Sequence, residues 1–444
     1  MKFFYNFVYL LLLLASSPWI LWRILIQGKN RDGWMEKLFG LVPVAPRRSG
    51  NIRCIWIHAV SVGEVNLLPR LVDHLKQNYG DLCFAISTTT QTGLQLAQSK
   101  FPNDQVFYCP SDFSWAVNNA LNRIEPDMML LTELEIWPNL ISLTANRNIP
   151  VVLINGRIGK QSFNGYRRIR FLFANILSRL TLALVQTDDY RDRLNFLGMP
   201  DEKIAVTGNI KFDNAFSTPQ TSAKQAIQEL ANFDDDDFVF VAGSTLELED
   251  RLLLEIFAEL RTRHPSLKLV LVPRHPERVP QLENAVRKLK LGYSLRSKLN
   301  SECVRNQQND ILIVNVIGEL GIWWQLADAG FVGGSMGQRG GQNMIEPAAF
   351  GVPIAFGPDT RNFKDVVQLL LGDQGAKRIH DRHELQQFIE WTISEGSQAK
   401  MMGRRACEIT MKQRGALKQT ADALIGILNA NTRSNVESDS RSAA

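Results

Sequence analysis

The sequence predicts an α/β protein made of two doubly wound domains. Short apolar runs of strand length alternate with helical lengths between residues 52 and 356, which is typical of parallel sheets with helices on both faces. The 444 residues exceed what one hydrophobic core usually organises. A polar stretch at residues 214–237 separates two such series. We therefore expect domains at residues 50–215 and 235–425, facing each other across a cleft lined by strand ends.

Composition excludes several classes of protein. Apolar residues make up 45% of the chain and charged residues 21%, as in globular proteins. The net charge of +5 is mild, and no basic run carries interleaved aromatics, so a nucleic-acid partner is not expected. The charge would suit an acidic membrane surface or a phosphorylated partner. The five cysteines show no CxxC spacing, which indicates a reducing compartment and neither a disulfide framework nor a zinc site.

The amino end predicts a membrane anchor over residues 1–28. Residues 3–26 are apolar apart from Asn6, a Ser-Ser-Pro interruption at residues 16–18, and Arg23, and that length matches a bilayer. Basic residues follow this run in excess, which places the body of the protein on the cytoplasmic side. Two alternatives remain at this point: a signal peptide cleaved near residues 15–17, and a helix that lies in the membrane interface.

The first series of strands is expected at residues 52–58, 82–87, 105–108, 127–131, 151–155, 182–186 and 204–207. Glu64 follows the first strand where a helix begins, and parallel sheets bind ligands at this end of their strands. Glu64 is thus a candidate catalytic carboxylate, although an acidic residue in a first helical turn also complements the helix dipole. Polar residues after later strands are candidates for the same cleft: Glu133, Glu135, Arg157 and Lys211.

The second series is expected at residues 238–242, 267–272, 311–314, 329–332 and 352–356. Arg274 follows the second of these and could grip a phosphate; the alternative is a surface salt bridge. Residues 331–347 hold five glycines ahead of a predicted helix. Glycines let a backbone approach a ligand closely, and a helix N-terminus favours an anion, but such a stretch is also compatible with a plain loop. The Ser- and Asn-rich residues 430–444 predict a disordered tail.

These motifs, taken together, resemble one family along nearly the whole chain. The matching segments are residues 34–40 (WMEKLFG), 56–64 (WIHAVSVGE), 132–139 (TELEIWPN), 208–213 (GNIKFD), 273–276 (PRHP), 318–320 (GEL), 331–335 (FVGGS), 341–347 (GQNMIEP) and 362–365 (NFKD). The chain is similar to the Kdo transferases, glycosyltransferases that move the acidic eight-carbon sugar Kdo from CMP-Kdo to a lipid A precursor. Their activity belongs to lipopolysaccharide biosynthesis at the inner (plasma) membrane.

The resemblance implies a GT-B fold of two Rossmann-like domains and an inverting transfer without a metal or other cofactor. It places Glu64 at the general base, and Glu133 or Glu135 together with Lys211 at positions that stabilise the transition state. It also implies that CMP binds at Pro273 and Arg274, at Ile317, Gly318 and Glu319, and at Asn343, Met344, Ile345 and Glu346.

One segment departs from the family pattern. At residues 155–163 (NGRIGKQSF), the family usually has Asn-Ala-Arg followed by Ser-x-Arg-Ser. This departure leaves open the acceptor and the number of Kdo units added. Two other functions also remain open: a different GT-B enzyme, such as a UDP-sugar transferase or epimerase acting on a membrane lipid, and a non-catalytic, membrane-anchored protein that binds sugar nucleotides.

Overall fold

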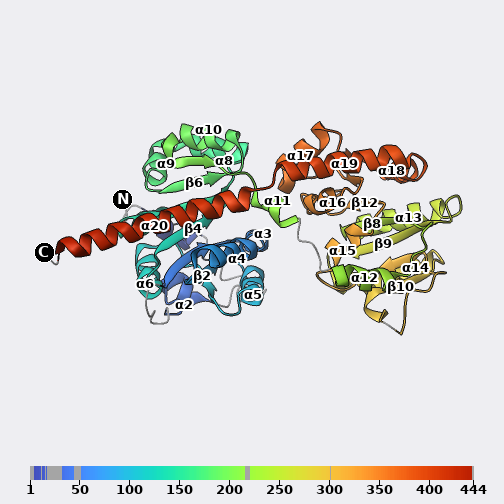
Figure 1. Cartoon of the computed structure of the whole chain (residues 1–444), viewed down its shortest axis with the longest axis horizontal. Helices are drawn as coiled ribbons and strands as arrows, with labels where there is room; N and C mark the ends of the chain where they lie inside the picture. The colour runs from blue at the N-terminus through green and yellow to red at the C-terminus, as the bar shows by residue number, and fades with distance from the viewer. Residues whose placement is uncertain are drawn as a thin grey trace. The chain divides into compact units, whose positions relative to one another are not determined.

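The computed structural model describes residues 5–11, 13–15, 17, 33–44, 52–215, 221–300 and 302–442. The chain divides into two compact units: Met1–Ile210 with Arg414–Ala444, and Lys211–Gln413 (Figure 1). Each unit contains one parallel sheet, and helices pack on both of its faces. The predicted α/β class with two doubly wound units is therefore confirmed.

In the described part of the first unit, seven strands form the sheet: β1 (Arg53–His58), β2 (Leu82–Thr88), β3 (Gln105–Tyr108), β4 (Met128–Thr132), β5 (Val151–Gly156), β6 (Leu182–Val185) and β7 (Ile204–Val206). Their order is β3-β2-β1-β4-β5-β6-β7, and all neighbouring strands are parallel. The order reverses between β1 and β4, which is where open α/β sheets bind ligands.

Both faces of this sheet are covered, so its strands are apolar on both sides. Successive side chains of a strand point to opposite faces. Cys54 and Trp56 of β1 therefore join one core, while Ile55 and Ile57 join the other. This double burial explains why the central strands appear in the sequence as short continuous apolar runs.

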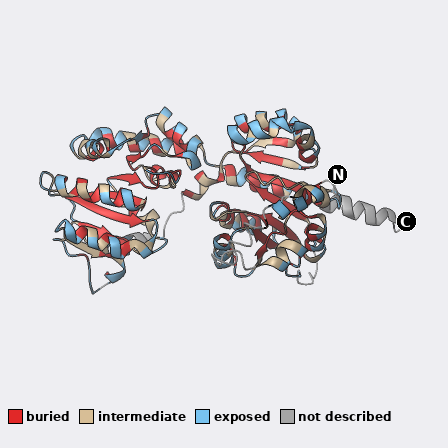
Figure 2. Cartoon of the chain, turned by 180° about the vertical axis from the view of Figure 1, so that it is seen from behind, coloured by how far each residue is buried: buried red, intermediate tan, exposed pale blue. Residues whose placement is uncertain are grey.

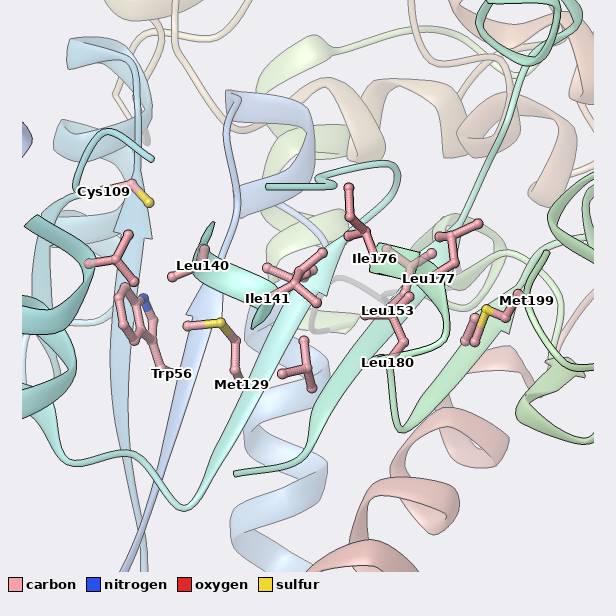
Figure 3. Close-up of a cluster of buried hydrophobic side chains, with 14 of the residues drawn as sticks. Trp56, Cys109, Met129, Leu140, Ile141, Leu153, Ile176, Leu177, Leu180 and Met199 are labelled. Carbon is pink, nitrogen blue, oxygen red and sulfur yellow. The ribbon is translucent and has the colours of Figure 1, made fainter. Parts of the chain in front are cut away.

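Helices of the first unit are α2 (Trp34–Phe39), α3 (Val62–Val65), α4 (Leu68–Tyr79), α5 (Gln91–Lys100), α6 (Ser114–Ile124), α7 (Pro138–Ala145), α8 (Lys160–Arg168), α9 (Arg170–Leu177) and α10 (Asp188–Phe196). Side chains of α6, α7, α9 and α10 fill one core, and those of α3, α4 and α5 fill the other. Figure 3 shows the first of these cores, in which Leu140 and Ile141 of α7 lie close to Met129 of β4.

In the second unit the described strands are β8 (Phe238–Thr245), β9 (Leu267–Pro273), β10 (Tyr293–Leu295), β11 (Ile311–Ile313), β12 (Ala329–Val332), β13 (Ile354–Phe356) and β14 (Ala376–Arg378). The sheet order is β10-β11-β9-β8-β12-β13-β14, again all parallel. The order reverses between β8 and β12. The central strands of both sheets are buried (Figure 2).

Helices of the second unit are α12 (Thr221–Ala231), α13 (Glu247–Leu260), α14 (Val279–Lys288), α15 (Leu320–Gln325), α16 (Ile345–Ala349), α17 (Lys364–Gly372), α18 (Arg382–Ser394) and α19 (Gly396–Lys412). Side chains of α13, α14 and α18 pack on one face of the sheet. Those of α12, α15, α16, α17 and α19 pack on the other. The glycine-rich residues 333–341 connect β12 to α16.

The last helix, α20 (Ala416–Ser442), belongs to the first unit. Ala421, Leu424 and Leu428 are buried in the same core as α4, beside which α20 lies in Figure 1. The sequence placed residues up to 425 in the second domain and a disordered tail at residues 430–444. The second unit instead ends at Gln413, and α20 continues to Ser442. Burial of its apolar stripe decides which unit it joins.

The amino end is described in part. Residues 5–11, 13–15 and 17 are helical, whereas most of the predicted anchor at residues 1–28 lies outside the described residues. Asn6 donates a hydrogen bond to Ser114 Oγ at 2.7 Å and accepts one from the Ser114 N–H at 3.0 Å. Tyr5 is buried in the first core. Where the chain is described, none of its helices combines the length and apolarity needed to span a membrane.

Candidate active site

Glu64 lies beside the reversal point of the first sheet. It belongs to α3, directly after β1, and its side chain turns back toward the ends of β1 and β4. The Val60 N–H donates to Oε2 at 2.9 Å, and the Ser61 hydroxyl donates to Oε1 at 2.9 Å. The Thr132 hydroxyl, at the end of β4, hydrogen-bonds to Oε2 as well. The carboxylate is thus fixed at the strand ends, as a working carboxylate requires, rather than only complementing a helix dipole.

Burial raises the pKa of the Glu64 carboxyl group. Its side chain is 8% exposed, and this desolvation raises its pKa, while the hydrogen bonds from Thr132, Val60 and Ser61 oppose the rise. A carboxylate with a raised pKa is, once ionised, a stronger base than a solvated one. The arrangement suits removal of a proton from an alcohol.

Glu133 and Glu135 follow β4 and come close enough to Glu64 to interact with it electrostatically. Glu135 Oε2 accepts a hydrogen bond from Trp137 Nε1 at 2.8 Å. Burial raises the pKa of Glu135 to about 7, and the negative charges of Glu64 and Glu133 add to the rise. The structure therefore brings these three predicted carboxylates together. Ionisable groups with shifted pKa values, placed where the strand order of a sheet reverses, are characteristic of catalytic sites.

The backbone is strained at the same edge of the sheet. Glu133 has φ 50° and Asn155, at the end of β5, has φ 52°. Left-handed backbone costs a non-glycine residue roughly 1 kcal/mol or more. Surrounding bonds maintain it: the Glu133 N–H donates to Ile154 O at 3.0 Å, and its carbonyl accepts from the Arg157 N–H at 3.1 Å. Such strain turns the Glu133 side chain away from the direction that an extended strand would give.

His58 is a member of this cluster that the sequence did not assign to the site. It is the last residue of β1 and is fully buried. Its Nε2 lies 3.9 Å from Glu135 Oε2, and its Nδ1 lies 3.0 Å from Ser87 Oγ. Burial lowers the pKa of His58 to about 4, so the ring is neutral at physiological pH. The sequence signal that could have pointed to His58 is a polar residue at the end of a largely apolar strand.

In the second unit, N–H groups at the start of the glycine loop after β12 donate hydrogen bonds to a buried carboxylate of the same unit. Glu249, in the first turn of α13, accepts hydrogen bonds from the N–H groups of Gly334 (2.8 Å), Ser335 (2.8 Å) and Met336 (3.0 Å). It also accepts one from the Leu246 N–H at 2.9 Å. Glu249 is 2% exposed. Sequence reasoning missed this residue, because it lies 85 positions before Gly334.

The N–H groups of Gly334, Ser335 and Met336 are therefore satisfied within the chain, as the plain-loop alternative allows. Binding of an anion at the N-terminus of the following helix stays a prediction. Near the end of the loop, Asp359 Oδ2 likewise accepts from the Gly340 N–H at 2.8 Å. The glycines have a packing role instead. A Cβ on Gly333 would lie 2.6 Å from the Ser244 carbonyl oxygen, and Gly334 has φ 67°. Only glycine fits both conditions without strain.

The segment after the loop contains Asn343, Met344, Ile345 and Glu346. Asn343 Oδ1 accepts from the Ile345 N–H at 3.1 Å, and Asn343 Nδ2 donates to Glu346 Oε1 at 3.0 Å. Met344 and Ile345 are buried, and burial raises the pKa of Glu346. Asn343 thereby orients the Glu346 carboxyl at the start of α16.

Pro273 ends β9, and Arg274 follows it at the carboxyl edge of the second sheet. The Arg274 N–H donates to Thr245 O at 2.9 Å. Its guanidinium is exposed, and no acidic side chain in the described part of the chain pairs with it. The alternative of a surface salt bridge is thus not supported. An exposed cation at a strand end is available to an anionic ligand.

Glu319 has a different environment from the one expected. Both of its carboxylate oxygens accept hydrogen bonds from Arg296, at 2.9 and 2.8 Å. The preceding Ile317 is 86% exposed, and Gly318 has φ 94°. The ion pair therefore fixes the loop and leaves the backbone of Ile317 and Gly318 accessible.

Lys211 lies in α11 (Ile210–Ala215), at the first residue of the second unit. Among the described residues, no group of three or more His, Cys, Asp or Glu side chains is arranged to hold a metal ion. The absence of a metal from the reaction stays a prediction.

Comparisons with known proteins identify the family. The family model for 3-deoxy-D-manno-octulosonic-acid transferase (kdotransferase) matches residues 32–214. The chain is 31% identical over 438 residues to 3-deoxy-D-manno-octulosonic acid transferase of Haemophilus influenzae, covering 96% of this chain and 100% of the relative. The chain belongs to the Kdo transferase family. The Bordetella pertussis enzyme of the same name is 29% identical, with 94% and 98% covered.

The resemblance stated from the motifs is thereby confirmed, as is the class of enzyme: the chain is a Kdo-transferring glycosyltransferase. Among solved structures, UDP-GlcNAc 2-epimerase from Neisseria meningitidis is similar with a TM-score of 0.59 and 14% identity, over 84% of this chain and 100% of that one. At that identity the similarity shows the fold alone. The rival epimerase function gains nothing from it.

Proposed function

We propose that this Kdo transferase uses CMP-Kdo as donor and a lipid A precursor as acceptor, and that it inverts the anomeric configuration with Glu64 as general base. The observation that carries the proposal is the fixed, buried Glu64 carboxylate at the sheet reversal point. A sugar hydroxyl is a weak nucleophile, and its attack needs a base within hydrogen-bond reach. Direct attack by the activated hydroxyl inverts the donor carbon.

The second unit supplies the donor-binding groups in this proposal. The exposed Arg274 guanidinium would hold the phosphate, and Lys211 would add positive charge as the phosphate leaves. Accessible backbone at Ile317 and Gly318, together with Pro273, would border the nucleotide. Positive charge placed where the leaving phosphate gains negative charge stabilises the transition state.

The segment 343–346 and the Glu319 loop complete the proposed CMP site. Glu346, oriented by Asn343, would accept hydrogen bonds from ribose hydroxyls. Met344 and Ile345 are buried and would hold the segment in place, while Glu319 would act through its ion pair with Arg296 rather than by direct contact. In the first unit, Glu133 would stabilise positive charge that develops on the sugar ring.

The direct test is incubation of the protein with CMP-Kdo and a lipid A precursor, followed by mass measurement of the product. One added Kdo mass, or two, gives the number of units transferred. The anomeric configuration of the product, determined by NMR, tests inversion. UDP-sugar turnover without CMP-Kdo turnover would instead support the rival glycosyltransferase or epimerase. Donor binding without any transfer would support a non-catalytic binding protein.

We further propose that the amino end attaches the protein to the cytoplasmic face of the inner membrane. The described part of this helix exposes Phe7, Leu10, Leu11 and Leu14. Its other face is tied to the body through Tyr5 and Asn6. Because one face of this helix packs on the folded body and the other is exposed and apolar, we favour a helix that lies in the membrane interface over one that crosses the membrane.

Deletion of residues 1–26 is expected to abolish membrane binding and leave a folded body of lower stability. The deletion removes the burial of Tyr5 and the hydrogen bonds of Asn6, together worth roughly 3 kcal/mol, or about 5–10 °C in Tm. Flotation with vesicles that contain anionic lipid measures the first effect, and calorimetry measures the second. Asn6→Ala is the matched control, which should lower Tm yet still float. A truncated protein that floats like the full chain contradicts the proposal.

Arg274→Ala is expected to weaken CMP binding by about 1.5–3 kcal/mol, the usual contribution of a charged hydrogen bond. Isothermal titration with CMP measures this directly. Arg251→Ala removes another exposed arginine of the same unit, one that pairs with Glu255 on the surface of α13, and should leave affinity unchanged. Equal affinities for wild type and Arg274→Ala would remove Arg274 from the nucleotide site.

A further inference from the structure

The carboxylate cluster of the first unit contains a buried nitrogen that the proposed mechanism does not use. His58 Nε2 is inaccessible to solvent and has no hydrogen-bond partner among the described residues. It faces Glu135 Oε2 at 3.9 Å, which is too long for a hydrogen bond. The ring also contacts Trp137 edge-on, with centroids 6.4 Å apart. Trp137 donates to Glu135, so both aromatic side chains border the same carboxyl group.

The other ring nitrogen decides which atom of His58 carries the proton. Nδ1 lies 3.2 Å from the Ser87 carbonyl oxygen, which can only accept, and 3.0 Å from Ser87 Oγ. Ser87 Oγ already accepts from Trp56 Nε1 at 2.8 Å. These partners favour a proton on Nδ1. Nε2 then presents its lone pair to Glu135.

A lone pair that faces a buried carboxylate disfavours the ionised form of that carboxylate. The effect acts with other ionisable groups around Glu135, and among the described residues no cation is found to interact with this carboxyl group. They come from five segments: His58 on β1, Glu64 on α3, Cys109 after β3, Glu133 on the same loop, and Tyr166 on α8. Glu64, in contrast, has three hydrogen-bond donors that favour its ionised form. The first proton to leave the pair therefore comes from Glu64.

We infer that Glu135 works in its protonated form, with His58 as the positioning residue that keeps the proton there, and that Glu135 donates a hydrogen bond to an anionic oxygen of the substrate. The inference rests on the proposed function, in which the transferred sugar is itself acidic. A second ionised carboxylate beside Glu64 would repel such a sugar, whereas a neutral carboxyl group can bind it. Of the two glutamates that the resemblance places at the transition state, Glu133 would then supply the negative charge and Glu135 the neutral hydrogen-bond donor.

Glu135→Gln tests the inference, because an amide has the same shape as a neutral carboxyl group, with one acceptor and one donor. The variant should retain transfer within about tenfold, whereas loss of a general base costs about 10²–10⁴-fold. In the wild type, kcat/KM should rise as Glu64 ionises and fall above about pH 7 as Glu135 ionises. The fall at high pH should be absent in Glu135→Gln. A variant as inactive as Glu64→Gln, or one with an unchanged alkaline limb, overturns the inference.

His58→Asn tests the positioning role. Its amide nitrogen can replace Nδ1 at Ser87, but no lone pair reaches Glu135, so the alkaline limb should move to lower pH in the folded variant. An alkaline limb that stays in place contradicts the role of His58. Because His58 is fully buried, calorimetry must first show a cooperative transition; if it does not, Glu135→Gln alone decides. Wild-type protein that fails to transfer Kdo contradicts the proposed function, whereas active wild type with inactive Glu135→Gln contradicts only this inference.

Discussion

Replacement of Glu64 by glutamine is expected to slow transfer by about 10²–10⁴-fold, the usual contribution of a general base. Glutamine fills the same space but cannot accept the proton of the acceptor hydroxyl. Its amide oxygen can still accept from the Val60 N–H and the Thr132 hydroxyl, and the Ser61 hydroxyl can turn to accept from the amide nitrogen. Single-turnover rates with CMP-Kdo and a lipid A precursor measure the loss, and titration with CMP should show unchanged donor affinity.

Stability should move in the opposite direction from activity. The folded-state pKa of Glu64 is raised by burial, so its protonated form is favoured by folding. The stability that it contributes is present below its ordinary pKa and is lost as pH rises through the raised value. Above the raised pKa the ionised side chain is therefore a cost, which glutamine removes. Glu64→Gln should melt at or above the wild-type temperature at pH 7, and this difference should vanish near pH 4.

Asp189→Asn is the matched control for this prediction. Asp189 also lies in the first turn of a helix that follows a strand of the first sheet, but it is exposed, and within the described part of the chain its ion pair is with Arg193. Its substitution should change neither the transfer rate nor CMP affinity. A Glu64→Gln protein that loses donor affinity and cooperative melting together would show that Glu64 supports the fold and has no role as a base.

The central strands could be predicted from sequence to within a few residues because both faces of each sheet are buried. A strand such as Val151–Gly156 is buried throughout, and its apolar run ends at Asn155. The strand β14 (Ala376–Arg378) was not predicted, because Lys377 and Arg378 are exposed at a sheet edge and the segment lacks an apolar run. The packing of α20 on the first unit could not be predicted from the sequence for another reason. An amphipathic stripe shows that a helix is buried on one side, but not which core it joins.

The same distinction applies to the site. Glu64 and Glu135 could be found because parallel sheets place functional side chains after their strands. His58 and Glu249 could not, because their roles depend on contacts with residues distant in the chain. His58 reads as the last residue of a strand, and Glu249 as an acidic residue in a first helical turn. Their partners, Glu135 and the Gly334 amide, are brought to them only by the folded sheets.

Replacement of Glu249 by alanine is the second change expected to have a large effect. It would leave four buried or partly buried N–H groups without an acceptor: those of Leu246, Gly334, Ser335 and Met336. Each such group costs about 1–3 kcal/mol when it is left unsatisfied. We therefore expect a loss on the order of 4 kcal/mol in the stability of the second unit, or about 10 °C in Tm. Calorimetry and CMP titration on the same samples measure stability and donor binding together.

Glu249→Gln separates charge from shape in this loop. Its amide oxygen can accept from one pair of N–H groups, but its amide nitrogen faces the other pair as a donor, so part of the loss should remain. Glu247→Ala removes the same charge from the same helical turn at an exposed position and should change nothing. If Glu249→Ala binds CMP as the wild type does and melts at the same temperature, the loop holds its shape without the carboxylate. In that case the N–H groups of Gly334, Ser335 and Met336 would be free to bind an anion after all.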